Sequence, residues 1–473
     1  MKSLSADENF LLRSPLARRL YHEHAAALPI IDYHSHLDAG DLAADRTYRD
    51  LTQLWLEPDQ YKHRAMRLLG VPEQAITGDA SPREKFDHWA ATLPQTLGNP
   101  LYHWSALELR RYFGVTEPLN PASADRIWAQ CNEQLAGPSH RARGLLAAAN
   151  VELVGTSDRW LDPLDAHRQL GADGFIPRVL PSLRADDALA IDEPGFRDWL
   201  GRLAAATGTR VSDLDSYRAA LNQRLDVFAA HGCTIADHGL DVFAFEAVSD
   251  TEANATLSRV LTGGRPDAAQ TRAFRSSLLA WLGESYGRRG WVMQLHLGAQ
   301  RHTSSRLRRL AGAAGGFAMI GRATDIPALC RCLDHLEIRD ALPKTILYPL
   351  NPADHAAFAV LTGSFTEDHV AGKIQFGPPW WFNDHDLGIR QHLDTLSRYG
   401  LLAPFIGMTT DSRSVLSLSR HEYFRRVLCD WFGAQVQAGI FPDDPDFLGN
   451  YVRRVAGANA RAWLASPAAL SLP

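Results

Sequence analysis

The sequence predicts an α/β protein whose core is a closed barrel of eight parallel strands. Eight short apolar runs, bounded by Gly, Pro or polar residues, recur along the 473 residues and are separated by stretches long enough for helices. Such alternation is typical of βαβ units, and a (β/α)8 TIM barrel is the simplest architecture for eight of them. An open, doubly wound sheet is the alternative. The expected strands span residues 30–36, 152–157, 175–182, 233–237, 291–297, 345–350, 373–377 and 405–410.

The expected strands carry no nucleotide-binding motif. Neither G-x-G-x-x-G nor G-x-x-x-x-G-K follows any of them. A Rossmann or P-loop phosphate site needs those glycines in the turn after a strand. We therefore expect no nucleotide cofactor.

A long insertion separates the first two expected strands. It is far too long for one crossover connection, and it contains segments of helical periodicity. We expect a helical subdomain above the barrel mouth at residues 38–150. Residues 1–37 then form the N-terminal segment and strand one, and residues 151–473 form the rest of the barrel with extra helices. The helical segments of the insertion are Asp50–Gly70, Ser81–Leu97 and Pro100–Gly114.

Composition indicates a large folded protein of the cytoplasm. Hydrophobic residues make up 45% of the chain and the mean hydropathy is −0.21, with no segment apolar enough to span a bilayer and no pattern of a secretory signal. The net charge is −5 and basic residues are not pooled into a stripe, which argues against nucleic-acid or membrane partners. The five cysteines are scattered without a C-x-x-C pair, so we expect neither disulfides nor a thiolate metal site.

The most informative stretch is residues 30–37, where an apolar run ends in His34 and His36. Side chains of a strand alternate between its two faces, so these imidazoles point the same way. Two imidazoles at a strand end can share one divalent cation, because neutral imidazole is the commonest protein ligand for such ions. The alternative is a chance pairing on a polar edge strand. The pattern marks a candidate metal site.

The last expected strand ends in Asp411. In a closed barrel the eighth strand pairs with the first, so Asp411 is expected beside His34 and His36, although more than three hundred residues separate them. Two imidazoles and one carboxylate, with positions left for water or substrate, suit a catalytic divalent site. A helix N-cap is the alternative role for Asp411.

Two further strand ends carry polar or aromatic groups. In residues 291–297 the large apolar side chains share one face, which leaves Gln294 and His296 pointing into the barrel. A packed barrel interior prefers branched aliphatic side chains, so a functional role for His296 is favoured over a core role. Strand seven is followed by Trp380 and a second Trp, which could offer a flat wall to the C–H face of a sugar, although packing is the commoner role of such a pair.

Nine separate blocks of sequence, spread along nearly the whole chain, form a specific pattern because they follow one another in a fixed order. They are Pro29–Leu37, Leu51–Leu56, Tyr61–Arg67, Thr77–Ala80, Gly98–Trp104, Gln294–Gly298, Pro379–Phe382, Thr410–Ser414 and Arg420–Arg426. Together they resemble uronate isomerase, the glucuronate isomerase branch of the amidohydrolase superfamily. The chain departs from the expected pattern at His63, where a Trp is expected, and at Ser35, where a Cys is frequent.

The resemblance implies an enzyme of hexuronate catabolism on a distorted (β/α)8 barrel of amidohydrolase type. It would interconvert D-glucuronate with D-fructuronate and D-galacturonate with D-tagaturonate, as an aldose–ketose isomerase. Most hydrolytic relatives hold two metals with the help of a histidine after strand six, whereas strand six here ends in Tyr348–Asn351. One divalent ion is therefore expected, zinc from its nitrogen and oxygen ligands, with manganese or another ion as the alternative.

The resemblance also implies roles for individual residues. Asp411 is the expected base, and Tyr61, from the insertion, is its acid partner in moving a proton between C2 and C1. The expected metal ligands are His34, His36 and Asp411, and His34 also counts among the catalytic groups. Guanidinium groups clamp a carboxylate through two hydrogen bonds. The expected substrate-binding residues are Arg184, His296, Arg301, Trp380 and Arg413.

Two other functions stay open from the sequence. A metal-dependent hydrolase acting on a sugar lactone would use the same barrel and the same histidine pair, and a catalytically silent sugar-acid-binding protein would keep the pocket. The missing strand-six histidine weighs against the first, and the intact candidate base and ligands weigh against the second. A direct hydride shift between C2 and C1 is the alternative to proton transfer. The expected partner is a small hexuronate, bound by a chain that could form a homo-oligomer.

Overall fold

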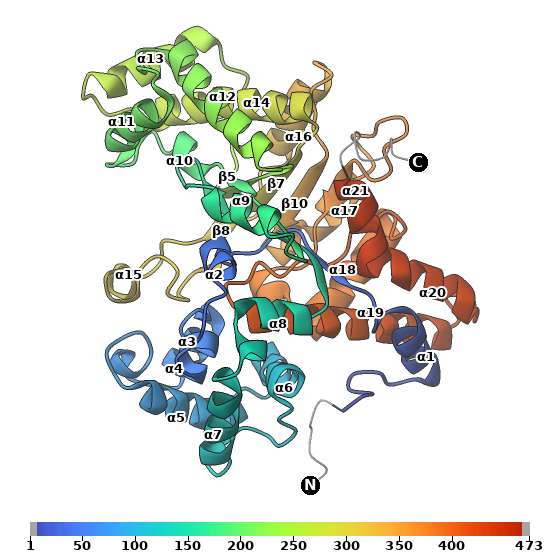
Figure 1. Cartoon of the computed structure of the whole chain (residues 1–473). Coiled ribbons are helices and arrows are strands. Elements are labelled where there is room, and N and C mark those ends of the chain that lie inside the picture. Colours follow the sequence, from blue (N-terminus) through green and yellow to red (C-terminus); the bar gives the residue numbers. More distant parts are fainter. Residues whose placement is uncertain (1–6, 466–473) are drawn as a thin grey trace.

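The computed structural model describes residues 7–465 and has parallel strands at its centre with helices around them (Figure 1). One sheet has the order β1-β2-β4, and a second has the order β11-β10-β7-β6-β5-β3. A separate antiparallel pair is formed by β8 and β9. The strands are β1 (Ile30–Asp32), β2 (Val151–Gly155), β3 (Asp158–Arg159), β4 (Arg178–Leu180), β5 (Leu183–Arg184), β6 (Ile235–Leu240), β7 (Val292–Leu297), β8 (Ala299–Gln300), β9 (Met319–Ile320), β10 (Thr345–Pro349) and β11 (Ile374–Phe376).

The third expected strand is broken into two pieces. β4 ends before Pro181, which has no backbone N–H to donate, and the chain resumes pairing as β5 on the other sheet. Backbone bonds continue the pairing of the two chain segments on either side of the break. Thr156 N–H donates to the Leu180 carbonyl (3.0 Å) and Asp158 N–H donates to the Ser182 carbonyl (2.8 Å). The ring of strands is distorted here but continuous.

The eighth expected strand, residues 405–410, is wrong as a regular strand, because no strand is assigned at those described positions. Gly407, within this segment, has a left-handed conformation with φ of 77°, which takes the chain out of strand geometry. The segment nevertheless closes the ring. On the β11 side, Ile406 N–H donates to Oε1 of Gln375 (3.3 Å). On the β1 side, Asp411 N–H donates to the His34 carbonyl (3.0 Å).

Two apolar clusters lie on opposite faces of the strands. Val292 of β7 belongs to a smaller cluster that contains side chains of β1, β6, β7 and β10. Met293 and Leu295 belong to the main core that the helices cover. Gln294 and His296 alternate with the main-core residues and share the face of Val292. The predicted inward orientation of these two polar side chains is confirmed.

The insertion is helical, as predicted, but its first expected helix is two helices. Pro58 lies between them, and Asp59 caps the second by accepting hydrogen bonds from the N–H groups of Tyr61 and Lys62. Of the inserted helices, α3 to α7 gather at one end of the molecule (Figure 1), and α6 packs on α19. Domain boundaries at residues 37 and 150 stay a prediction. The helices are α2 (Ala39–Ala43), α3 (Leu51–Trp55), α4 (Gln60–Leu68), α5 (Pro82–Thr92), α6 (Pro100–Phe113), α7 (Ala124–Leu135) and α8 (Ala142–Ala148).

The remaining helices surround the strands, and α11 to α14 form a second helical layer at the end opposite α3 to α7 (Figure 1). Among residues 7–465, no helix combines the length and apolar character that crossing a bilayer requires. These helices are α1 (Pro15–His24), α9 (Asp165–Ala172), α10 (Asp186–Leu189), α11 (Phe196–Thr207), α12 (Leu214–Ala230), α13 (Asp250–Leu261), α14 (Ala268–Arg289), α15 (Ser305–Ala311), α16 (Ile326–Glu337), α17 (His355–Leu361), α18 (Asp386–Tyr399), α19 (Ser419–Gln437), α20 (Pro445–Arg453) and α21 (Asn459–Leu464).

Gly407 in the closing segment has no room for a side chain. Its φ is 77°, and a Cβ placed on it would collide with the carbonyl oxygen of Val455. Gly439 has a similar φ of 70° but no atom within 4 Å of that position, so it is a matched control. We expect Gly407→Ala to lower the free energy of unfolding by about 2–5 kcal/mol, from left-handed strain plus overpacking, and Gly439→Ala by about 1–2 kcal/mol from strain alone. Urea denaturation measures both, and equal losses would contradict this packing.

Candidate active site

A buried carboxylate at the end of β1 fixes the closing segment against the first strand. Asp32 accepts hydrogen bonds from the hydroxyls of Thr409 and Thr410 (both 2.6 Å) and from the Thr410 N–H (2.8 Å). Burial works to raise the pKa of Asp32, but the neighbouring His421 imidazole and the two threonines outweigh it, so the pKa lies below its ordinary value. The carboxylate is therefore charged at neutral pH and sets the register of the residues that follow.

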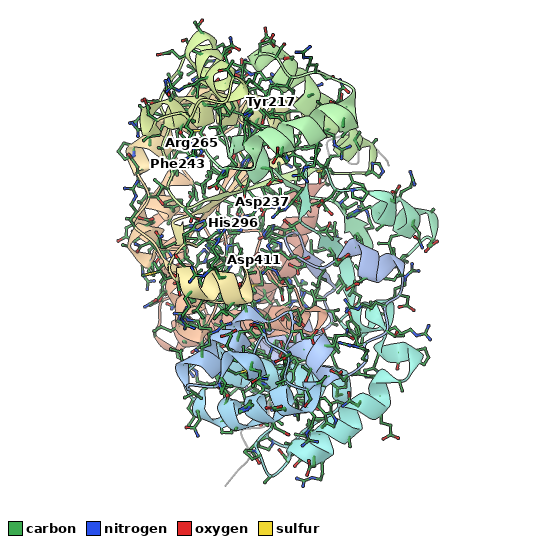
Figure 2. The ribbon with its side chains drawn as sticks, turned by 90° about the vertical axis from the view of Figure 1, so that its left-hand side faces the viewer. Tyr217, Asp237, Phe243, Arg265, His296 and Asp411 are labelled. Atoms are coloured by element: carbon green, nitrogen blue, oxygen red, sulfur yellow. The ribbon has the colours of Figure 1, made fainter. Side chains whose placement is uncertain are left out.

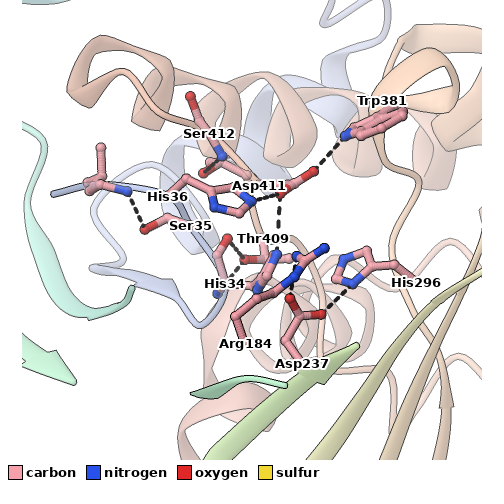
Figure 3. Close-up of polar contacts among 12 residues, drawn as sticks. His34, Ser35, His36, Arg184, Asp237, His296, Trp381, Thr409, Asp411 and Ser412 are labelled. Carbon is pink, nitrogen blue, oxygen red and sulfur yellow. Dashed lines mark hydrogen bonds and ion pairs between the residues drawn. The ribbon is translucent and has the colours of Figure 1, made fainter. Parts of the chain in front are cut away.

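That register brings His34, His36 and Asp411 together (Figure 3). Oδ1 of Asp411 lies 3.2 Å from Nε2 of His34 and 3.0 Å from Nε2 of His36. His34 and Asp411 are buried, and the His36 side chain is 21% exposed. A second backbone bond, from His36 N–H to the Ser412 carbonyl (2.8 Å), holds the two segments side by side. The predicted juxtaposition of the histidine pair with the distant aspartate is confirmed.

The donor set fits a divalent cation. Nδ1 of His34 is buried without a hydrogen-bond partner, and the three ligand atoms of the set lie within 4.8 Å of one another. Burial lowers the pKa of His36 to about 4, which favours the neutral imidazole that binds metal. Burial also lowers the pKa of His34, but the carboxylates of Asp237 and Asp411 outweigh it and raise the pKa. The site therefore attracts positive charge, as a cation-binding site must.

A second buried cluster adjoins the first. His296 Nδ1 lies 2.6 Å from Oδ1 of Asp237, whose Oδ2 pairs with Nη1 of Arg184 (2.6 Å). Burial works to raise the pKa of Asp237, but Arg184, His296 and His34 outweigh it and hold the pKa well below its ordinary value. Figure 2 shows Asp237, His296 and Asp411 near the middle of the molecule, between the two helical layers.

Aromatic rings enclose His296. Tyr348 stacks on its imidazole with ring centres 4.4 Å apart and planes within 5°, and Trp380 meets it edge-on at 4.8 Å. Tyr348 in turn donates its hydroxyl to Oε1 of Gln294 (2.6 Å). Trp380 is only 4% exposed. It therefore packs the wall behind His296, while its neighbour Trp381 reaches the first cluster.

Trp381 holds the second oxygen of the candidate base. Its Nε1 donates to Oδ2 of Asp411 (2.8 Å). Both residues have a φ of 50°, a left-handed conformation that costs a non-glycine residue about 1–2 kcal/mol. Strained backbone of this kind concentrates at functional sites, where surrounding contacts enforce it. The structure thus aims this carboxylate with one oxygen toward two imidazoles and the other toward an indole.

The sequence profile of the glucuronate isomerase family matches residues 1–464. The chain belongs to the glucuronate isomerase family. A uronate isomerase of Salmonella arizonae is 48% identical over 462 residues, which cover 97% of this chain and 98% of that protein. The solved uronate isomerase of Thermotoga maritima has a TM-score of 0.91 at 30% identity and covers 97% of this chain and 99% of its own. The glucuronate isomerase of Caulobacter crescentus has a TM-score of 0.89 at 25% identity, with coverages of 98% and 96%.

In this isomerase the insertion delivers Tyr61 to the site. Tyr61 lines a small cavity together with Asp411, Arg413 and Arg420. Its hydroxyl is buried without a hydrogen-bond partner, and burial raises its pKa, so the phenol stays protonated at neutral pH. The polar stretch around Tyr61 is not a solvated face: Lys62 beside it is 1% exposed.

The three predicted arginines occupy different surroundings. Arg413 is exposed and lines the cavity together with Asp411. Arg301 pairs with Asp241 and lies 5.4 Å from the centre of the Trp381 ring. Arg184 is already committed to two carboxylates, so its role as a substrate clamp stays a prediction.

Sequence reasoning missed two residues of the site that the structure brings to its centre. Asp237 stands at the end of the fourth expected strand, where functional groups gather in this fold, and that position alone was signal enough to single it out. Trp381 gave no comparable signal, because its neighbour Trp380 carries the same side chain and only the local backbone decides which indole faces Asp411.

Proposed function

We propose that this isomerase interconverts D-glucuronate with D-fructuronate, and D-galacturonate with D-tagaturonate, in hexuronate catabolism. The observation that carries the proposal is the pairing of Asp411, held between two imidazoles, with the unpartnered Tyr61 hydroxyl in one cavity. Aldose-to-ketose conversion moves a proton from C2 to C1 of the open-chain sugar, so it needs a base and an acid on one substrate. The cavity supplies both.

Asp411 is the proposed base. Its carboxylate takes the proton from C2, and the enediolate that results is reprotonated at C1 while the oxygens exchange a proton with Tyr61 as the acid partner. Burial keeps the Tyr61 phenol protonated, so it can donate. The Trp381 indole fixes Oδ2 of Asp411 during the transfer.

His34, His36 and Asp411 would hold one divalent ion. We propose zinc, from the nitrogen and oxygen donors, with manganese as the alternative. When bound, the ion supplies a positive charge that orients substrate oxygens and stabilises negative charge developing on them. A carboxylate that binds a dication strongly is a weak base. Asp411 would therefore act as base only if it binds the ion weakly or not at all.

Arg301 and Arg413 are the proposed clamps for the uronate carboxylate, and His296 with Trp380 forms the wall of the sugar site. A guanidinium meets a carboxylate with two parallel hydrogen bonds, which fixes the orientation of the sugar as well as its position. Arg301 is held in place by Asp241, whereas Arg413 is free to turn onto a ligand.

We propose a cytoplasmic location, consistent with five free thiols. Self-association stays an expectation.

Asp411→Asn tests the base directly. The amide cannot accept the C2 proton, so we expect turnover of both D-glucuronate and D-galacturonate to fall by about 10²- to 10⁴-fold while the fold is retained. Ketose formation by the purified wild type and variant measures the change, with circular dichroism as the check on folding. Lactone hydrolysis is assayed in parallel. Near-wild-type isomerisation by the variant, or a wild type that hydrolyses lactones and forms no ketose, would contradict the proposal.

Solvent isotope incorporation separates proton transfer from a hydride shift. A proton carried by Asp411 exchanges with water during its transfer, so turnover in deuterated water is expected to place deuterium at C1 of the ketose. A hydride moving directly between carbons carries its own hydrogen. Nuclear magnetic resonance of the product at early conversion measures the label, and an unlabelled C1 would count strongly against proton transfer through Asp411.

A further inference from the structure

Two sets of buried side chains in this isomerase could hold a metal ion, and they share His34 (Figure 3). One set is His34, His36 and Asp411, and the other is His34, Asp237 and His296. In each set the ligand atoms lie within 4.8 Å of one another. The imidazoles of His34 and His296 are 4.7 Å apart between ring centres. The second set meets the same distance limit as the first, and all three of its residues are buried.

The shared histidine limits the site to one ion at a time. A neutral imidazole has one nitrogen with a free lone pair, because the other nitrogen carries the proton. His34 can therefore serve one ion only, and each set has just two members besides it. The two sets are alternative positions for a single ion.

Arg184 pairs with the carboxylate of the second set. Its Nη1 lies 2.6 Å from Oδ2 of Asp237, and its Nε lies 2.7 Å from Oδ2 of Asp186. The guanidinium is permanently charged. His296 contacts the remaining oxygen of Asp237 at 2.6 Å. Both oxygens of this carboxylate are thus engaged before any ion arrives.

The surrounding backbone is shaped for that guanidinium. Oδ1 of Asp186 accepts a hydrogen bond from Gly239 N–H (2.8 Å), which fixes the carboxylate that orients Arg184. A Cβ at Gly239 would collide with Nη2 of Arg184. By contrast, Asp411 forms no ion pair with Lys or Arg in the described chain, and its close partners are two imidazoles and an indole.

We propose that Arg184 selects the position of the catalytic ion. Its positive charge repels a cation from the set of His34, Asp237 and His296. The ion is therefore bound by the set of His34, His36 and Asp411. This inference rests on the proposed function, in which a divalent ion binds at that first set. Arg184 is accordingly a positioning residue: it acts on the ion through Asp237.

Zinc affinity in a double variant tests the selection. Asp411→Ala removes a ligand from the first set, and we expect it to weaken Zn²⁺ binding by at least about a hundredfold, measured by competition with a chromophoric chelator. Adding Arg184→Met opens the second set, so we expect the double variant to regain at least about tenfold of that affinity. A third substitution, Asp237→Asn, is expected to abolish the gain.

Arg301→Met in the Asp411→Ala background is the matched control, because Arg301 is also an arginine of the site but pairs with Asp241, outside both sets. It is expected to restore no affinity. Arg184→Met leaves Asp237 buried without a counter-charge, so Arg184→Gln, which keeps a hydrogen-bond donor for Asp237, is the second variant if circular dichroism shows the first to be unfolded.

The outcomes distinguish this inference from the proposed function. Recovery that needs both the loss of Arg184 and the presence of Asp237 supports the selection. No recovery in either Arg184 variant, equal recovery with Arg301→Met, or recovery that survives Asp237→Asn would overturn it, while wild-type protein still binds one zinc and isomerises uronates. A wild type that binds no zinc would instead contradict the single-ion site itself.

Discussion

The hydrogen bonds between Asp32, in the first strand, and Thr409 and Thr410, in the closing segment, are the constraint on which the rest of the site depends. Asp32 is fully buried, and its carboxylate accepts hydrogen bonds from the hydroxyls of Thr409 and Thr410 and from the Thr410 N–H. Hydrogen bonds to a charged group contribute about 1.5–3 kcal/mol each. Together with the backbone bonds to His34 and His36, they fix the register of the closing segment, which has no regular strand pairing, and place Asp411 between the two imidazoles.

Much of this arrangement follows from the sequence, because periodicity and strand position carry it. Alternation along a strand orients His296 inward, and ring closure brings Asp411 to His34 and His36. What periodicity cannot show is local backbone conformation. The left-handed φ of Gly407 ends the eighth expected strand, and Pro181 breaks the third. The role of Trp381 could not be predicted for the same reason, because its φ of 50° turns its indole to Asp411.

The charges of the site form two balanced groups. Asp237 is neutralised by Arg184 inside the protein, so its carboxylate needs no outside cation. Asp411 has imidazoles in place of an arginine, and the proposed ion would supply the same compensation. A buried carboxylate left without positive charge is strongly unfavourable. This asymmetry supports the proposal that a single ion binds beside Asp411, next to the cavity that Tyr61 and Arg413 line.

Anomalous diffraction from crystals grown with manganese is the most direct test of the central claim. One strong peak about 2.0–2.3 Å from Nε2 of His34, Nε2 of His36 and the Asp411 carboxylate is the predicted result. A peak between Asp237 and His296, a peak on the surface only, or the three side chains lying apart in the metal-loaded crystal would contradict it.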